Sequence, residues 1–275
     1  VLEIGAGTGN LTNATLYSPA SHISAVEVLP QLLLFQSILH KTLLSLFHQI
    51  DTAMIDHLHS RFSSEIASGR LSVISQDIRK LAGDPYDVCV GNIPYSISSD
   101  IVRHVVSSFF PHTRVAVLLV QDMFANKIAS PPGSDDYGPL SAFLGYLAHV
   151  QVVKHVNKQL FEPVPKVDSA IVKLSPRGNV RHSVDTCERF ENFVNLCFTK
   201  ANKTLKSIFN SSGPREYLIK CLKHSIVVDR PATRLNVSKF EESAEVYVKE
   251  MMETILQELE LTGHRARHVE SEKLA

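Results

Sequence analysis

The chain has 275 residues, of which 44% are hydrophobic and 20% are charged, and its formal net charge is zero. That is enough material for one large domain or two modest ones, each with an ordinary globular core. The four cysteines are far apart in the sequence, a spacing that argues against a zinc site or a disulfide framework and for reduced thiols inside a cell.

Basic residues are unevenly spread. Residues 177–234 carry 11 Lys and Arg against 5 Asp and Glu, whereas residues 1–176 carry 12 against 14 and residues 235–275 carry 5 against 9. A basic block of this kind is suited to phosphate groups. The alternative is a helical segment whose lysines are simply solvated, and charge alone does not separate the two.

The chain begins inside an apolar run, VLEIG, that reads as a first strand. A strand at the first residue, with no initiator Met, suggests a fragment or an incomplete gene model. Glycines follow at positions 5, 7 and 9, where a dinucleotide-binding turn would need Gly rather than Asn at position 10. An acid before such a turn, here Glu3, is typical of S-adenosylmethionine sites; an ordinary structural turn is the alternative.

Two acids end the next two predicted strands. Glu27 closes the strand 22–28, 18 residues after Gly9, where a carboxylate can accept both hydroxyls of a ribose. Asp77 closes the strand 71–77 and can accept from an adenine amino group. A surface acid at a strand end is the alternative for each. Between these strands, the leucine-rich stretch 29–47 is interrupted by Gln, His and Lys, which favours an amphipathic helix over a membrane span.

A fourth predicted strand, 86–90, leads into Gly91-Asn92-Ile93-Pro94-Tyr95. At the carboxyl end of a parallel strand these side chains face the ligand crevice. If the Asn92 amide and the Ile93 carbonyl accept the two hydrogens of an aromatic amine, its nitrogen becomes tetrahedral and its lone pair is free to attack a methyl group. Tyr95 offers a flat face to a base. The alternative is a proline turn with a packed tyrosine.

The remaining predicted strands are 115–121, 149–156 and 169–176, and one of the last two is expected to be antiparallel because little room is left for a helix between them. A rigid Pro-x-Pro loop before the last strand would hold Phe161 opposite Tyr95 for an extruded base; a buried Phe in a rigid loop is the alternative. Strands alternating with helices predict an α/β fold with a mainly parallel sheet for residues 1–176, and a small helical domain for residues 177–275.

The segments EIGAGTGNLT, VEV, SQDI, NIPYSISS, VQDMFANKIASPPGSDDYGPLS, FEPVPKVDSAIVKL and KANKTLKSIF occur in this order. Together they resemble the ribosomal RNA adenine dimethyltransferases, which modify two adjacent adenosines near the 3′ end of small-subunit rRNA. The resemblance runs from Val1 to about Phe209. It implies a Rossmann-like methyltransferase domain, a helical C-terminal domain and methyl transfer from S-adenosylmethionine.

Matching the motifs assigns roles to individual residues. Asn92, Ile93 and Pro94 would hold the target amine, and Tyr95 and Phe161 would stack on the base. The resemblance also implies a cofactor site and a set of phosphate contacts: Glu3, Gly5, Gly7, Glu27, Val28, Asp77, Ile78 and Asn92 for S-adenosylmethionine, and Lys200, Lys203 and Lys206 for rRNA.

Some features depart from the family pattern. The Gly-Gln-x-Phe segment with which members usually open is missing, so we expect weak cofactor binding by this chain. Leu29 stands where an acid often follows the ribose-binding Glu, and Pro139 replaces a residue that is usually basic. The stretch between Glu27 and Asp77 is longer than expected and contains His40, His48, His57 and His59. We interpret these histidines as polar helix faces rather than a metal site.

Two other functions remain open: a macrolide-resistance methyltransferase of large-subunit rRNA, and a non-catalytic ribosome-assembly or mitochondrial transcription factor of the same fold. The Pro-Lys-Val-Asp-Ser and Lys-Thr-Leu segments favour the small-subunit enzymes, and Ile93 argues against DNA adenine and protein-glutamine methyltransferases. We expect a monomer that acts on the pre-ribosomal small subunit, without a membrane, in the nucleolus or cytoplasm or else in an organelle.

Overall fold

The computed structural model describes residues 1–27, 53–81, 86–178, 183–200, 202–229 and 237–274. The chain divides into two compact units. Unit 1 comprises Val1–Ala129 and Leu147–Cys187, and unit 2 comprises Ser130–Tyr146 and Glu188–Ala275. Each unit is described by itself.

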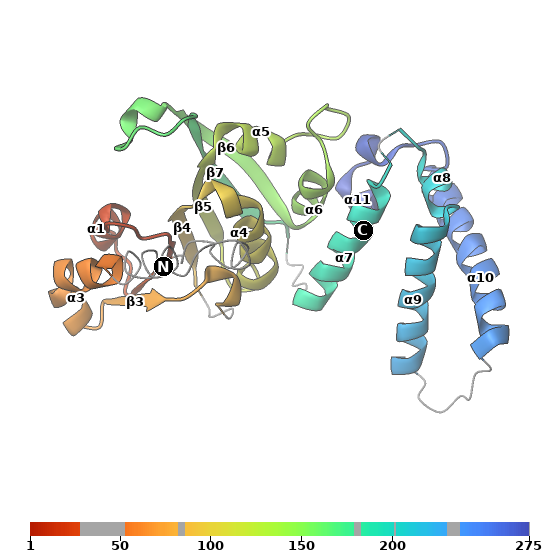
Figure 1. The fold of residues 1–275 in the computed structure, drawn as a ribbon, viewed down its shortest axis with the longest axis horizontal. Coiled ribbons are helices and arrows are strands. Elements are labelled where there is room, and N and C mark those ends of the chain that lie inside the picture. The colour runs from red at the N-terminus through yellow and green to blue at the C-terminus, as the bar shows by residue number, and fades with distance from the viewer. Residues whose placement is uncertain (28–52, 82–85, 179–182, 201, 230–236, 275) are drawn as a thin grey trace, which may run out of the picture. The chain divides into compact units, whose positions relative to one another are not determined.

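Unit 1 is built on a seven-stranded sheet with the order β3-β2-β1-β4-β5-β7-β6 (Figure 1). All seven predicted strands are present, with ends that differ from the predicted ones by two residues or fewer. They are β1 (Leu2–Ile4), β2 (Ile23–Glu27), β3 (Leu71–Ser75), β4 (Val88–Asn92), β5 (Val115–Gln121), β6 (Ala148–Val156) and β7 (Ser169–Pro176).

Strand direction follows the prediction as well. The pairs β2–β3, β1–β2, β1–β4 and β4–β5 are parallel, whereas β7 is antiparallel to both β5 and β6. Parallel neighbours need a crossover between them, and the helices that follow each strand supply it. The expected α/β fold with a mainly parallel sheet is confirmed.

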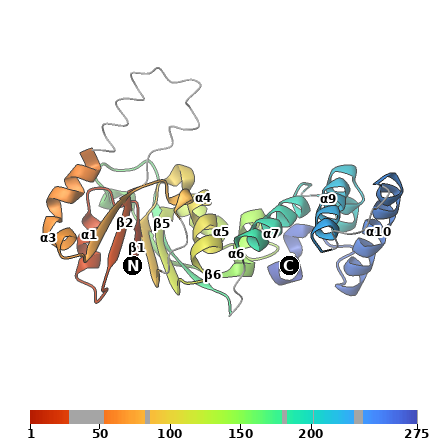
Figure 2. The ribbon, with the colours of Figure 1, turned by 90° about the horizontal axis from the view of Figure 1, so that it is seen from below.

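Helices occupy these crossovers (Figure 2). Residues 53–61 are helical and lead into α3. The helical elements of unit 1 are α1 (Asn10–Leu16), α3 (Ser63–Ala67), η1 (Ile78–Lys80), η2 (Tyr95–Ile97), α4 (Ser98–His104), the π-helical turn η3 (Val105–Phe109), α5 (Asp122–Ile128) and η4 (Lys158–Leu160).

Glycine allows β1 and β4 to lie unusually close together. Ile4 is paired with Gly91 across the two strands. A Cβ atom on Gly91 would lie 2.6 Å from the Ile4 carbonyl oxygen, and one on Gly5 would lie 2.8 Å from the Asn92 carbonyl oxygen. Both distances are shorter than any van der Waals contact, so only glycine fits at either position.

A hydrophobic cluster fixes α1 and the chain before α3 against the β2–β3 edge of the sheet. Leu58 and Phe62 are 0% and 3% exposed and pack with Leu16 and Ile23. A Cβ on Gly9 would lie 2.4 Å from the Phe62 ring. The cluster therefore seats the residues 58–62 directly against the glycine turn.

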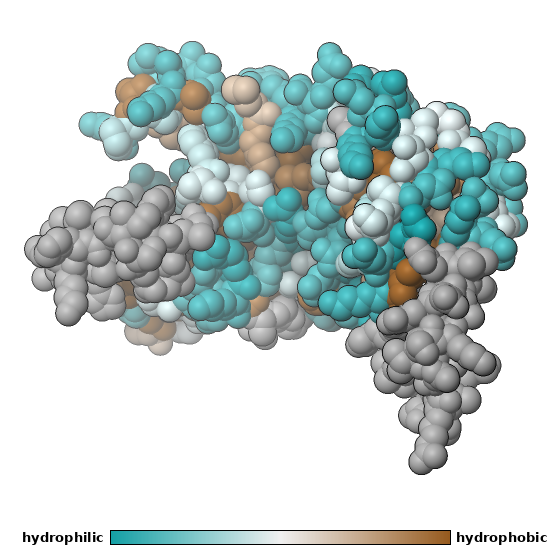
Figure 3. Space-filling model, turned by 45° about the vertical axis from the view of Figure 1, so that its right-hand side comes forward, coloured by the Kyte–Doolittle hydropathy of each residue, from teal (hydrophilic) through white to brown (hydrophobic). Residues whose placement is uncertain are grey.

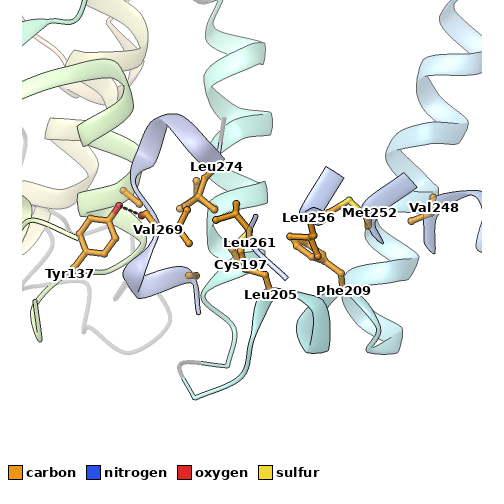
Figure 4. Packing of buried hydrophobic residues seen from close by; sticks show 13 residues of the cluster. Tyr137, Cys197, Leu205, Phe209, Val248, Met252, Leu256, Leu261, Val269 and Leu274 are labelled. Carbon is orange, nitrogen blue, oxygen red and sulfur yellow. Dashed lines mark hydrogen bonds between the residues drawn. The ribbon is translucent and has the colours of Figure 1, made fainter. Parts of the chain in front are cut away.

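Unit 2 is helical and consists of α6 (Pro139–Leu147), α7 (Val184–Cys197), α8 (Leu205–Phe209), α9 (Ser212–Asp229), α10 (Val237–Glu258), η5 (Ala266–His268) and α11 (Ser271–Leu274), although the ends of α6 and α7 reach into unit 1. In both views α9 and α10 lie side by side (Figures 1 and 2). Its core joins α7, α8 and α10 to the C-terminal residues (Figure 4). The Tyr137 hydroxyl donates a 3.1 Å hydrogen bond to the Val269 carbonyl within this core.

The units do not divide at residue 176, where the sequence suggested a boundary. Unit 1 continues to Cys187, and residues 130–146, which precede the last two strands, group with the C-terminal helices. Sequence order hides this because an inserted segment can pack with a distant part of the chain. None of the four cysteines, all of which lie in the described ranges, is part of a disulfide bond. Within the described ranges, no helix is both long and apolar enough to cross a membrane.

The close approach of β1 and β4 is testable. We expect Gly91→Ala to lower the free energy of unfolding by about 1–3 kcal/mol, because the added methyl group meets the backbone of Ile4 and the neighbouring strand cannot yield without loss of pairing. Urea denaturation measures the change. Gly213→Ala is the matched control: its site is exposed and open, so that variant should be neutral or slightly stabilising. Equal stability of the two variants would contradict the packing argument.

Candidate functional site

The candidate residues gather at one edge of the sheet. Because β1 to β5 run in the same direction, Gly5, Glu27, Asp77, Asn92 and Gln121 all lie at or just beyond the carboxyl ends of their strands. In an open parallel sheet this edge is where ligands bind. Strand β7 runs the other way, so its first residues reach the same edge.

The glycine turn after β1 forms an open cradle. Gly5, Gly7 and Gly9 have φ angles of +74°, +53° and +83°, values that L side chains rarely adopt. A Cβ on Gly7 would meet no described residue within 4 Å, so this part of the structure leaves the space above the turn open. The Gly7 N–H donates a 2.6 Å hydrogen bond to Glu27 Oε2, which holds that carboxylate beside the turn.

Glu3 is a fully buried acid beneath the turn. Neither of its carboxylate oxygens has a hydrogen-bond partner within the described part of the chain, and the same is true of the buried Thr12 hydroxyl. Burial raises the pKa of Glu3 from its ordinary value of 4.5 to about 7. The neighbouring Thr12 hydroxyl and N–H lower this pKa by less, although neither meets the geometry of a hydrogen bond, and the nearby Glu27 carboxylate raises it further. A ligand with a cationic amino group would supply the missing partner, so these residues fit the amino acid part of S-adenosylmethionine.

Asp77 already accepts several hydrogen bonds within the protein, which the sequence did not indicate. Arg79 donates to it through Nε at 2.9 Å and Nη2 at 2.6 Å, and the Arg79 N–H donates to Oδ1 at 3.0 Å. These bonds hold the pKa of Asp77 below its ordinary value. Arg79 Nε also donates to Oδ2 at 3.1 Å, so four contacts fill the roughly four lone pairs of this carboxylate, and an adenine amino group would have to displace one of them. The next residue, Ile78, is buried and begins η1.

The Asn92–Tyr95 loop leaves the proposed acceptors unengaged. The Pro94 carbonyl accepts from the Ser98 hydroxyl at 3.0 Å and from the Ile97 N–H at 3.3 Å, which anchors the loop to α4. The Asn92 side chain is exposed, and among the described residues neither its amide nor the Ile93 carbonyl oxygen takes part in a hydrogen bond. Both oxygens are therefore available to an incoming amine.

Tyr95 is fixed by a residue to which the sequence assigned no role. Its hydroxyl shares a 2.6 Å hydrogen bond with the hydroxyl of Ser169, the fully buried first residue of β7. In the sequence, Ser169 is only the last residue of the Pro-Lys-Val-Asp-Ser segment. Neighbouring residues give no indication that its hydroxyl bonds to Tyr95, 74 residues away.

Asp168 is a second missed residue. Its side chain accepts from the Lys158 N–H at 2.9 Å and its carbonyl accepts from the Asp122 N–H at 3.0 Å. It thus ties η4 and the start of α5 to β7, and Phe161 follows η4 directly. Phe161 and Tyr95 form no ring contact in the described structure. The aromatic sandwich stays a prediction.

The three candidate lysines of unit 2 differ from one another. Lys200 and Lys203 are exposed and form no ion pair with any described residue, whereas Lys206 lies 3.4 Å from Glu253. The Leu205 N–H donates to the His264 carbonyl at 2.9 Å, which brings the basic segment 264–268 beside α8. The segment was not predicted as a phosphate contact because residues 235–275 are acidic overall. Its own sequence, HRARH, is basic and was the local indication of such a role.

The remaining predictions concern Val28 and the histidines between Glu27 and Asp77. Val28, His40 and His48 lie outside the described residues, as does the stretch 29–47. His57 and His59 are exposed on a helix. Across the described ranges, no three His, Cys, Asp or Glu side chains are grouped in a way that would hold a metal ion.

The buried Glu3 predicts how stability depends on pH. The folded protein keeps the Glu3 proton up to about pH 7, whereas the unfolded chain loses it near 4.5, so rising pH over this window favours unfolding. We expect the ligand-free protein to lose up to about 3 kcal/mol between pH 4.5 and 7 from this group. Urea denaturation across the range measures it, and Glu3→Gln should remove most of the loss. The control, Glu188→Gln at an exposed site, should keep it; an unchanged pH profile in Glu3→Gln would contradict the assignment.

Comparison with known proteins connects this site to a family. The family model described as "Ribosomal RNA adenine dimethylase" matches residues 1–249. A probable dimethyladenosine transferase of Caenorhabditis elegans is 35% identical over 79% of this chain and 62% of its own length. A ribosomal RNA small subunit methyltransferase of Arabidopsis thaliana is 35% identical over 81% of this chain and 56% of its own length. The chain thus spans less than two thirds of the length of these relatives.

Solved structures agree with the sequence comparison. A dimethyladenosine transferase from Plasmodium falciparum aligns over 99% of this chain and 86% of its own, with a TM-score of 0.71 and 26% identity. The 23S rRNA methyltransferase ErmE aligns over the same shares with a TM-score of 0.55 and 23% identity, which shows a common fold. The predicted Rossmann-like methyltransferase fold is confirmed, and the chain belongs to the ribosomal RNA adenine dimethylase family.

Proposed function

We propose that the protein transfers methyl groups from S-adenosylmethionine to the 6-amino groups of two adjacent adenosines in small-subunit rRNA, as a step of ribosome biogenesis. One observation carries the proposal. The Asn92 carbonyl oxygen lies 2.8 Å from the position of a Cβ on Gly5, so the candidate amine-holding loop adjoins the candidate cofactor turn. The family and the names of the relatives from Caenorhabditis elegans and Arabidopsis thaliana support the choice of substrate.

S-adenosylmethionine would supply an electrophilic methyl group at the glycine turn. Glu3, Glu27 and Asp77 are the acids that would bind its amino, ribose and adenine groups. Burial of Glu3 without a partner costs free energy that a bound ammonium group would recover. The open space at Gly7 and the fixed Glu27 carboxylate suit the same ligand.

The chain's own chemistry is orientation and hydrogen bonding. An exocyclic amine is a weak nucleophile because its lone pair is delocalised into the ring. Asn92 and the Ile93 carbonyl would accept its two hydrogens and draw the nitrogen towards tetrahedral geometry, which frees the lone pair. Tyr95 would stack on the base, with its ring position set by Ser169.

The basic residues 177–234 support an RNA partner. Lys200 and Lys203 are exposed and form no ion pair with a described residue, which makes them the better candidates for phosphate contacts; Lys206 is already paired with Glu253. Within this proposal, residues 177–275 form the RNA-contacting part of a monomeric enzyme, its partner is the pre-ribosomal small subunit, and its compartment is the nucleolus or the cytoplasm.

Asn92 is the most direct test. We expect Asn92→Ala to lower the rate of methyl transfer to pre-ribosomal small subunits by about 100-fold or more, because one of the two acceptors that shape the amine is lost. Transfer of labelled methyl groups measures the rate. RNA binding should remain, since Asn92 offers no charge to a phosphate. Full activity in Asn92→Ala would refute its role, and an inactive wild-type protein that binds RNA would favour a non-catalytic assembly factor. Methylation of large-subunit rRNA instead would favour the resistance-type enzymes.

Ser169 is a positioning residue whose effect should pass through Tyr95. We expect Ser169→Ala and Tyr95→Phe to lower kcat to a similar extent, and the double variant to lose no more than either single one, because both changes remove the same hydrogen bond. Ser169→Thr, which keeps the hydroxyl, should restore much of the activity. Single-turnover methylation measures these rates. Fully additive losses would show that the two hydroxyls act independently.

A further inference from the structure

A pocket of about 300 Å³ lies at the end of β5, on the edge of the sheet at which Tyr95 follows β4. This volume is at the lower end of the range for small-ligand sites, about 300–1,000 Å³. Gln121, Asp122 and Met123 line it from the end of β5 and the start of α5, and Lys158, Lys166 and Asp168 line it from the connection between β6 and β7.

The pocket adjoins the place expected for the target base. Gln121, in its wall, is paired with Ser169 across β5 and β7. Ser169 in turn holds the Tyr95 hydroxyl at 2.6 Å. Two neighbouring nucleotides of one RNA strand would meet this surface in succession, one at Tyr95 and one in the pocket.

The pocket lining carries two ammonium groups and two carboxylates, which differ in how far they are engaged. The Asp122 carboxylate is bound to His155 Nδ1 at 2.5 Å, and the Asp168 carboxylate accepts from the Lys158 N–H at 2.9 Å. Both acids are therefore engaged. The ammonium groups of Lys158 and Lys166 form no ion pair with any residue that the structure describes, and Lys158 Nζ contacts only the Lys166 carbonyl, at 3.5 Å. Since these two ammonium groups have no ion-pair partner among the described residues, they are the groups of this lining that could bind a phosphate.

Exposed apolar side chains lie on the segments that supply the pocket lining. Met123 is 75% exposed, Leu160 is 77% exposed and Val164 is 54% exposed. The connection between β6 and β7 projects from unit 1 in Figure 1, and hydrophobic atoms lie among hydrophilic ones on the projecting lobe in Figure 3. Methionine is flexible and polarisable, which suits contact with the flat face of a base.

We propose that this pocket binds the nucleotide adjacent to the target adenosine, with Lys158 and Lys166 on its phosphate and Met123 against its base. The inference rests on the proposed function, since it takes RNA as the substrate. It adds a second nucleotide subsite to the amine-holding loop, and so accounts for the selection of an adenosine that has a neighbour in the strand over a free nucleoside.

The test separates the two subsites by the length of the probe. An RNA hairpin with two adjacent adenosines in its loop would use both, whereas free adenosine would use only the Tyr95 subsite. We expect the double variant Lys158→Gln/Lys166→Gln to bind the hairpin roughly tenfold more weakly at ~0.1 M salt, with a logarithmic salt slope shallower by about 1.4 for two lost single-strand phosphate contacts. Its affinity for adenosine should be unchanged. Met123→Ala should weaken hairpin binding without altering the salt slope.

Lys173→Gln is the matched control, because it removes the same charge from an exposed position on β7 outside the pocket. It should bind both probes as the wild type does, and thermal unfolding of all variants should coincide because the altered side chains lie at the surface. If the double variant binds the hairpin like Lys173→Gln, the pocket is not a nucleotide subsite. Loss of adenosine binding in step with hairpin binding would also overturn the proposal, since the lysines would then serve the target base. A wild type that binds the hairpin through these lysines but transfers no methyl group would support the pocket and refute the proposed activity.

Discussion

Strand direction is the constraint on which the rest of unit 1 depends. Five parallel strands deliver their carboxyl ends to one edge of the sheet, so the glycine turn, two acids and the Asn92–Tyr95 loop meet there although up to 90 residues separate them in sequence. The single reversed strand, β7, completes the arrangement. Because it runs antiparallel to β5, it begins where the others end, and Ser169 and the loop before it reach the same edge. A parallel β7 would leave them at the opposite edge.

Several features of this edge lower the stability of the ligand-free protein. Gly5, Gly7 and Gly9 have positive φ angles, and glycine loses more backbone entropy on folding than any other residue. Glu3 is buried with no hydrogen-bond partner among the described residues, and burial raises its pKa. Asp77 is the opposite case, since Arg79 satisfies it and lowers its pKa. Features that weaken the empty protein and have no structural benefit are expected where a ligand completes the site.

The proposed substrate contacts lie along the same edge of the sheet, beside the candidate cofactor site. Asp168 and Ser169 follow each other in the chain, yet one fixes η4 and the start of α5 while the other fixes the Tyr95 ring. A single short segment therefore sets the position of both nucleotide subsites relative to each other. Under the proposal, this gives a physical reason for the chemistry of the Pro-Lys-Val-Asp-Ser segment, because its lysine, acid and hydroxyl would each have a separate task.

The strands of unit 1 could be predicted from the sequence, and the sequence also suggested where a site lies. Alternating short apolar runs predicted all seven strands, the glycine spacing with Glu3 predicted a cofactor turn, and Asn92 to Tyr95 predicted a loop for an aromatic amine. These are local signals: periodicity, turn chemistry and residue type are readable within a dozen residues. Tertiary structure alone decided the pairing of Ser169 with Tyr95, the engagement of Asp77 by Arg79 and the grouping of residues 130–146 with the C-terminal helices. Contacts of this kind depend on which surfaces are buried together and on exact side-chain reach, and neither quantity is encoded within a short window of sequence.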